Sequence, residues 1–212
     1  MKTKTIALMM TGASGAQYGL RLLEQLLKLE QRVYLLLSRP AQLVINMETD
    51  LRLPGRATAI EAFFTERFQS KAGQLSVFER EQWAAPVASG SSVADASVVC
   101  PCTVGTLSAI ACGSSRTLIE RTADVALKER RRLILVVRET PFSEIHLENM
   151  LKLARMGAVI MPANPGFYFR PQSIDEVIDF IVARVLDHLG LEHQLQPRWG
   201  ESLSMTAGLS DD

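Results

Sequence analysis

The chain has 212 residues, and its 23 lysines and arginines balance its 23 aspartates and glutamates. Proteins that bind nucleic acid carry a basic excess, so this balance argues against such a partner. No apolar run is long enough to predict a membrane span. The three cysteines, Cys100, Cys102 and Cys112, without a secretion signal, favour free thiols in a reducing compartment, with the cytoplasm as the expected location.

Strand and helix patterns alternate from the beginning of the chain. Residues 5–10 form a short apolar run, and residues 11–15 then read Thr-Gly-Ala-Ser-Gly. Leucines at helical spacing occupy residues 16–29, and a second apolar run covers 33–37. This order predicts a βαβ unit in a parallel sheet that is buried on both faces.

The same alternation continues to the last helix, apart from residues 50–85, where no clear pattern emerges. The other expected elements are helices over 41–49, 104–111, 118–129, 143–156 and 174–189, and strands over 96–100, 133–137 and 158–161. The pattern predicts one doubly wound α/β domain over residues 1–200. Residues 201–212, rich in Ser, Gly and Asp, are expected to form a flexible tail.

Four predicted strands end in polar or glycine-rich sequence, and ligands of doubly wound sheets bind at these ends. The segments are residues 11–15, 38–39, 101–106 and 138–140. The first lacks the G-x-G-x-x-G pattern, and no acidic residue ends the second strand. These features disfavour NAD as the ligand. A mononucleotide such as FMN remains compatible with the sequence, and so does NADP.

Charged and polar residues elsewhere add candidate anion contacts. Arg121 and Lys128 lie seven residues apart on one helix face, where they could bind one anion or only form a solvated surface. The Ser89–Ser92 turn offers further donors. Cys100-Pro101-Cys102 has no second cysteine pair, and His146, His188 and His193 do not complete a zinc spacing, so no metal is expected.

Several strings resemble the UbiX flavin prenyltransferases, in order from residue 5 to about residue 190. They are Gly12 to Ala16, Met47 to Asp50, Ser89 to Ser91, Pro101-Cys102, Arg121 to Arg131, Arg138 to Pro141 and Pro165 to Tyr168. The segments 121–131 and 138–141 are the most specific. The chain departs from the family at Ala96-Ser97, where Gly-Met often stands.

The resemblance implies a Rossmann-like, flavodoxin-like fold and a homo-oligomer, typically a dodecamer, with sites between subunits. It implies transfer of a dimethylallyl group from dimethylallyl phosphate to N5 and C6 of reduced FMN. The prenylated FMN then serves a UbiD-type decarboxylase, commonly in ubiquinone biosynthesis.

Residue by residue, the resemblance also implies a site. The residues expected to contact FMN are Gly12, Ala13, Ser14, Ser38, Cys102, Thr103, Val104, Gly105 and Arg138. Those expected at the prenyl phosphate are Ser89, Gly90, Arg121, Lys128, Glu139, Tyr168 and Arg184, with Glu48 and Trp199 lining the site. The expected catalytic residues are Ser14, Glu48, Lys128 and Glu139, because prenyl transfer needs a stabilised leaving phosphate and carriers for the protons of ring closure.

Three alternative functions are compatible with some of these sequence features. A flavin-dependent cysteine-type decarboxylase has the same fold, but typically carries a histidine base after the glycine loop, and no histidine lies in the first 145 residues here. A noncatalytic FMN carrier would leave Arg121, Lys128 and Glu139 unexplained. An NADP reductase is the weakest alternative.

Overall fold

A computed structural model describes residues 3–196 of the chain. Six parallel strands form one sheet in the order β3-β2-β1-β4-β5-β6. Their bounds are β1 Thr5–Met10, β2 Arg32–Leu37, β3 Leu75–Phe78, β4 Ala96–Cys102, β5 Arg132–Val137 and β6 Val159–Pro162. This is the strand order of doubly wound nucleotide-binding folds, so the predicted fold class is confirmed.

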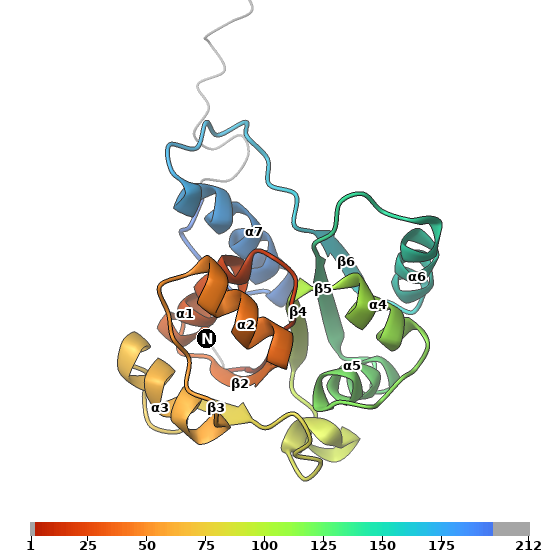
Figure 1. The fold of residues 1–212 in the computed structure, drawn as a ribbon, viewed down its shortest axis with the longest axis horizontal. Helices are drawn as coiled ribbons and strands as arrows, with labels where there is room; N and C mark the ends of the chain where they lie inside the picture. Colours follow the sequence, from red (N-terminus) through yellow and green to blue (C-terminus); the bar gives the residue numbers. More distant parts are fainter. Residues whose placement is uncertain (1–2, 197–212) are drawn as a thin grey trace, which may run out of the picture.

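Within residues 3–196, seven α-helices cover the two faces of the sheet. They are α1 Ala16–Lys28, α2 Arg39–Glu48, α3 Ala57–Phe68, α4 Val104–Ala111, α5 Leu118–Lys128, α6 Glu144–Arg155 and α7 Ile174–Leu189. Two hydrophobic clusters fill the space between the layers: α1, α2, α3 and α7 contribute to one, and α4, α5 and α6 contribute to the other. Figure 1 shows these two helical layers on opposite sides of the central strands.

The segment without a clear sequence pattern contains α3 and the edge strand β3. β3 has only four residues, and its side chains alternate between buried and half-buried positions. Helix α3 buries only three side chains, Ala57, Ile60 and Phe64, so its apolar face is narrow. Short elements at the edge of a sheet give weak periodicity, which explains why the sequence did not reveal them.

No helix of residues 3–196 is long and apolar enough to cross a membrane. Cys100 and Cys102 are buried at the end of β4, and Cys112 is exposed; none of the three forms a disulfide. Burial raises the pKa of the Cys102 thiol to about 12, so this thiol stays protonated at neutral pH. Burial thus makes the thiols of Cys100 and Cys102 unreactive.

Ser97 is a polar residue at the centre of the sheet. It lies in β4 between Ala7 and Leu133, is fully buried, and its hydroxyl has no hydrogen-bond partner among residues 3–196. An unpaired buried hydroxyl costs about 1 kcal/mol or more. We expect Ser97→Ala to raise the free energy of unfolding by about 1 kcal/mol in urea titrations.

Thr122→Val is the matched control for this variant. The Thr122 hydroxyl is equally buried, but it donates to the Leu118 carbonyl at 2.7 Å. Removing a satisfied hydroxyl should lower stability or leave it unchanged. A Ser97→Ala variant that is less stable than the wild type would show that the Ser97 hydroxyl has a favourable interaction.

Candidate functional site

The direction of the chain connections reverses between β1 and β4, and this reversal creates the crevice of the fold. From β1 the chain passes to α1 on one face, whereas from β4 it passes to α4 on the other. Thr11 joins the two strand ends: its hydroxyl donates to the Pro101 carbonyl at 2.7 Å and accepts the Thr103 N–H at 2.9 Å. The sequence analysis did not identify Thr11 as a site residue. The signal was present, as a hydroxyl residue directly after a buried strand and before a glycine.

The glycines after β1 are required by packing and backbone conformation. A Cβ atom on Gly12 would lie 2.3 Å from the Cβ of Pro40, so this glycine lets the first turn of α2 approach the loop. Gly15 has φ 93°, a conformation that side chains other than glycine rarely adopt. The loop conformation thus depends on both glycines, and Ser14 lies between them.

Glu48 occupies the beginning of α1, where the first backbone N–H groups of a helix have no partner within the helix. Its Oε2 atom accepts the N–H groups of Gly15 at 2.8 Å and Ala16 at 3.0 Å. The carboxylate thereby caps the positive end of the helix dipole. The N–H groups of Gly15 and Ala16 are consequently committed to Glu48 and are not available to a phosphate.

The same carboxylate is held in its ionised form. Burial acts to raise the pKa of Glu48, but a hydrogen bond from the Ser14 hydroxyl and those from the two backbone N–H groups outweigh it. The positive charge of Arg138 lowers the pKa further, and the net result is a pKa below the usual range of a glutamate. Glu48 therefore orients the Ser14 hydroxyl and can act as a proton acceptor.

Two helix N-caps face the same edge of the sheet. The Ser38 hydroxyl oxygen accepts the Ala41 N–H at 3.1 Å, and the Thr103 hydroxyl oxygen accepts the Thr106 N–H at 3.1 Å. These caps begin α2 and α4, and Val104 and Gly105 form the first turn of α4. The residues expected to contact FMN therefore line the β1–β4 crevice and its margins.

Arg138 and Glu139 follow β5 at this edge. The Nε atom of Arg138 is buried and has no hydrogen-bond partner among the described residues. Glu139 accepts the Thr140 N–H at 3.1 Å. Within residues 3–196 Glu139 forms no ion pair, and Arg121 and Lys128 pair with other carboxylates, Asp124 and Glu129.

Four residues expected at the prenyl phosphate form a second group, around α5. Arg121 donates from Nε to the Ala88 carbonyl at 3.0 Å, directly before Ser89. The Lys128 ammonium group lies beside Gly90, 2.9 Å from where a Cβ atom would stand. Arg121 and Lys128 thus border one loop, as their spacing predicted.

Tyr168 and Arg184 form a third group, along α7. The Tyr168 ring packs edge-on against Phe180, with ring centroids 5.9 Å apart, and Phe169 stacks on Phe180 at 5.7 Å. Arg184 is one helical turn beyond Phe180 and therefore on the same face of α7. Trp199 lies outside the described residues.

One chain does not bring these three groups together. The α5 group is on the face of the sheet opposite α7. Lys128 lies near the amino end of β5 and Arg138 follows its carboxyl end, so six strand residues, roughly 20 Å, separate them. In Figure 1 the loop that precedes β4 and the connection from β6 to α7 lie at opposite ends of the molecule. A site containing all three groups requires a second copy of the chain.

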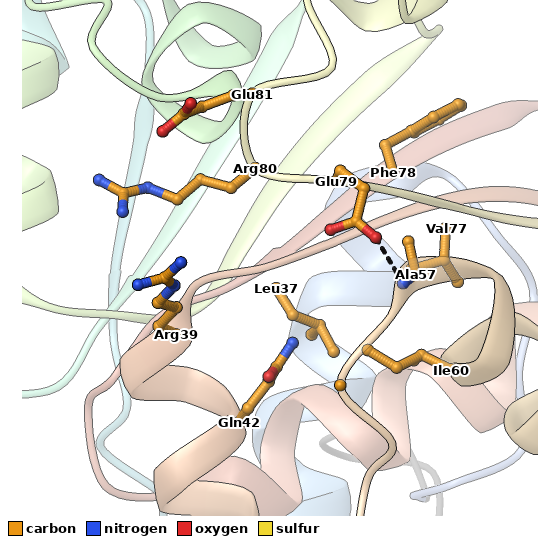
Figure 2. A pocket seen from close by; sticks show the side chains of 11 residues that line it. Leu37, Arg39, Gln42, Ala57, Ile60, Val77, Phe78, Glu79, Arg80 and Glu81 are labelled. Carbon is orange, nitrogen blue, oxygen red and sulfur yellow. Dashed lines mark hydrogen bonds between the residues drawn. The ribbon is translucent and has the colours of Figure 1, made fainter.

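A hollow of about 290 Å³ lies beside Ser38, at the carboxyl ends of β2 and β3. Figure 2 shows the guanidinium groups of Arg39 and Arg80 on one side of it, and the Glu79 carboxylate turned toward the Ala57 N–H, which it accepts at 2.7 Å. The sequence analysis did not predict this hollow, because β3 and Arg80 belong to the segment that showed no clear pattern.

Known proteins with similar sequences are flavoproteins, in agreement with a crevice that binds a flavin. A family model described as Flavoprotein matches residues 1–186. The chain is 59% identical to a flavin prenyltransferase UbiX from Pseudomonas aeruginosa, over 92% of this chain and 94% of the relative. The chain belongs to the UbiX flavin prenyltransferase family.

Two solved structures of this family superpose closely. AnUbiX (PadA1), in complex with FMN and dimethylallyl pyrophosphate, is 43% identical with a TM-score of 0.82, covering 93% of this chain and 98% of that chain. A dodecameric FMN-dependent UbiX-like decarboxylase from Escherichia coli is 39% identical with a TM-score of 0.80, covering 92% and 98%.

The crevice of this UbiX-family chain has the chemistry that FMN requires. The buried, unpartnered Nε of Arg138 is a charged donor without an acceptor, and an anionic or carbonyl oxygen of a flavin mononucleotide would satisfy it. The Ser38 and Thr103 N-caps place the beginnings of two helices at the same edge, where the helix dipoles favour a phosphate. The donors present therefore fit an anionic flavin.

We expect the stabilising effect of Glu48 to depend on pH. Because its pKa is lowered in the folded chain, its contribution is present above the ordinary value of 4.5 and is lost as pH falls through the lower, folded value. The difference in unfolding free energy between the wild type and Glu48→Gln should therefore be largest above pH 5 and shrink toward pH 3, in urea titrations across this range. Ser14→Ala should reduce the pH dependence, and a difference that is constant with pH would contradict the assignment.

Proposed function

We propose that this chain transfers a dimethylallyl group from dimethylallyl phosphate to N5 and C6 of reduced FMN, producing prenylated FMN. The observation that carries this proposal is the crevice itself, where an ionised Glu48 orients the Ser14 hydroxyl near Arg138, whose buried Nε has no hydrogen-bond partner among residues 3–196. A noncatalytic flavin carrier has no need of a hydroxyl–carboxylate pair beside the flavin.

Reduced FMN supplies an electron-rich ring system that attacks the allylic carbon. The carbon–oxygen bond of the donor breaks, and the phosphate leaves with the bonding electrons. Arg121, Lys128 and Arg184 stabilise that developing negative charge, and Tyr168 donates a neutral hydrogen bond. Cationic side chains replace the Mg²⁺ of pyrophosphate-dependent enzymes in this assignment, so the reaction is independent of metal.

Ring closure requires protons to be moved at the flavin edge. Ser14 and Glu48 form one route, because the Glu48 carboxylate is ionised and accepts a hydrogen bond from the Ser14 hydroxyl. Glu139 forms a second route, since its carboxylate has no cationic partner among the described residues of the chain. The departing phosphate is a third proton acceptor.

The complete site forms between copies of the chain, in a homo-oligomer that we expect to be a dodecamer. The separation of the α5 group from the crevice within one chain supports this arrangement. We infer further that the product passes to a UbiD-type decarboxylase in the cytoplasm, in agreement with the free thiols.

A direct assay tests the function. The protein, reduced FMN and dimethylallyl phosphate are incubated without air and with EDTA, and the flavin is analysed by mass spectrometry and absorbance. We expect the mass of FMN to increase by one C5H8 unit, with dimethylallyl diphosphate as the comparison donor. Unmodified flavin with both donors would contradict prenyl transfer, and carbon dioxide release from a cysteine peptide would support the cysteine-type decarboxylase.

Variants in the two separated groups test whether the site is shared between subunits. We expect Lys128→Ala to raise the KM for the donor roughly ten- to hundredfold, because a charged hydrogen bond to the phosphate is lost. We expect Arg138→Ala to weaken FMN binding instead, as measured by fluorescence titration.

Mixing the two variants distinguishes a shared site from a site within one chain. When equal amounts of Lys128→Ala and Arg138→Ala subunits are dissociated and reassembled together, roughly a quarter of shared sites regain both residues. Activity should then exceed that of either variant alone. No recovery in verified mixed oligomers would contradict the shared site.

A further inference from the structure

Arg184 is a long, exposed side chain that has to be held in place to recognise a phosphate. About 51% of its side chain is exposed, and fixing such a long side chain costs rotamer freedom. Its Nη1 donates to Oδ2 of Asp187 at 2.7 Å, three residues later on α7. An isolated exposed pair of this kind restrains an arginine only weakly, so the surroundings of Asp187 decide how firmly it is held.

Asp187 is itself held from the other side. Its Oδ1 atom lies 3.2 Å from Nε2 of His193, whose side chain is only 8% exposed. The chain reaches this point by turning back after α7: Gly190 ends the helix with φ 66°, and Leu191 is buried and donates its N–H to the Leu186 carbonyl at 3.0 Å. The turn thus holds His193 against the Asp187 carboxylate.

Hydrogen bonds also determine the tautomer of His193. Its Nδ1 atom accepts the Leu195 N–H at 3.3 Å, so the ring proton is on Nε2. Nε2 therefore donates to Oδ1 of Asp187, which leaves Oδ2 directed at Arg184. The three side chains form one chain of hydrogen bonds, His193 to Asp187 and Arg184 to Asp187, anchored in a nearly buried ring.

A purely structural role for Asp187 is already filled by another acid of the same helix. Asp179 binds Arg21 of α1 through two hydrogen bonds, of 2.7 and 2.9 Å, and so fastens α7 to its neighbour α1 in the same layer. Asp187 contacts Arg184 of the same helix through Oδ2 and His193 of the following turn through Oδ1. It is thus placed to orient that guanidinium group.

We propose that Asp187 and His193 are positioning residues for Arg184, holding its remaining N–H groups toward the phosphate of the prenyl donor. This inference rests on the proposed function, because it takes Arg184 as a contact of that phosphate. Neither Asp187 nor His193 touches the reacting atoms; both act through the guanidinium group.

The test measures donor KM, kcat and FMN affinity separately. We expect Asp187→Asn to raise the KM for dimethylallyl phosphate roughly tenfold, because a neutral amide holds the guanidinium group less firmly. FMN affinity should change less than twofold. His193→Ala should follow Asp187→Asn, whereas His193→Gln, whose amide can still donate to Oδ1, should retain most of the wild-type KM.

A double-mutant cycle and a matched control separate positioning from general damage. In an Arg184→Ala background, Asp187→Asn should cause no further increase in KM, because its effect passes through the missing guanidinium group. Asp179→Asn, on the same helix, should lower thermal stability without changing the donor KM. Independent effects of Asp187→Asn and Arg184→Ala, or an equal KM increase in Asp179→Asn, would overturn the proposal.

The wild-type chain distinguishes this inference from the proposed function. If the wild type prenylates FMN but Asp187→Asn keeps the normal donor KM, the positioning role is wrong and the function stands. If the wild type does not prenylate FMN, both fail together.

Discussion

The hydroxyl of Thr11 fixes the two strand ends between which the flavin crevice is built. It donates to one backbone group of the β4 end and accepts from another, at 2.7 and 2.9 Å. At this point the connections leave β1 and β4 toward opposite faces, so neither α1 nor α4 covers the gap. The hydroxyl gives the Thr103 N–H an acceptor, and the Pro101 carbonyl also accepts the Thr11 backbone N–H at 3.2 Å, so three hydrogen bonds join the two strand ends. The spacing between the Gly12–Ser14 loop and the N-cap of α4 follows from this link.

The electrostatics of the crevice depend on Glu48, whose carboxylate neutralises the positive end of the α1 dipole. Glu48 occupies the beginning of α1, so the helix that follows the glycine loop does not present its first N–H groups to a ligand. Arg138 lowers the pKa of Glu48, yet its own Nε has no partner among residues 3–196. A single carboxylate thus serves as helix cap, as the partner of Ser14 and as the counter-charge to the guanidinium group. These roles are coupled, because neutralising Glu48 would weaken all three at once.

Periodicity predicted most of the fold, because α1 and α7 are long, the central strands are almost fully buried, and their patterns are strong. It did not predict α3 and β3, whose apolar faces are narrow and lie at the edge of the sheet. The candidate residues at strand ends were predictable, since parallel strands place those ends along one edge. The occupation of the α1 N-terminus by Glu48 was not, because it depends on where the end of α2 lies in space. Nor could sequence spacing reveal that α5 and α7 cover opposite faces of the sheet. Residues on these two helices therefore cannot meet within a single chain.

Within one chain, Arg121 and Lys128 each form an ion pair with a nearby carboxylate. These pairs are weak enough to be exchanged for a phosphate in the proposed shared site. Arg121 pairs with Asp124 at 2.8 Å, and Lys128 pairs with Glu129, and all four side chains are about one-third exposed or more. Exposed pairs contribute about 1 kcal/mol or less, because water screens the charges. A phosphate dianion enclosed between subunits forms stronger charge-assisted hydrogen bonds in a drier environment. In the proposed shared site, these carboxylates would keep the cations oriented at little energetic cost and would yield to the phosphate once a neighbouring subunit excludes the water.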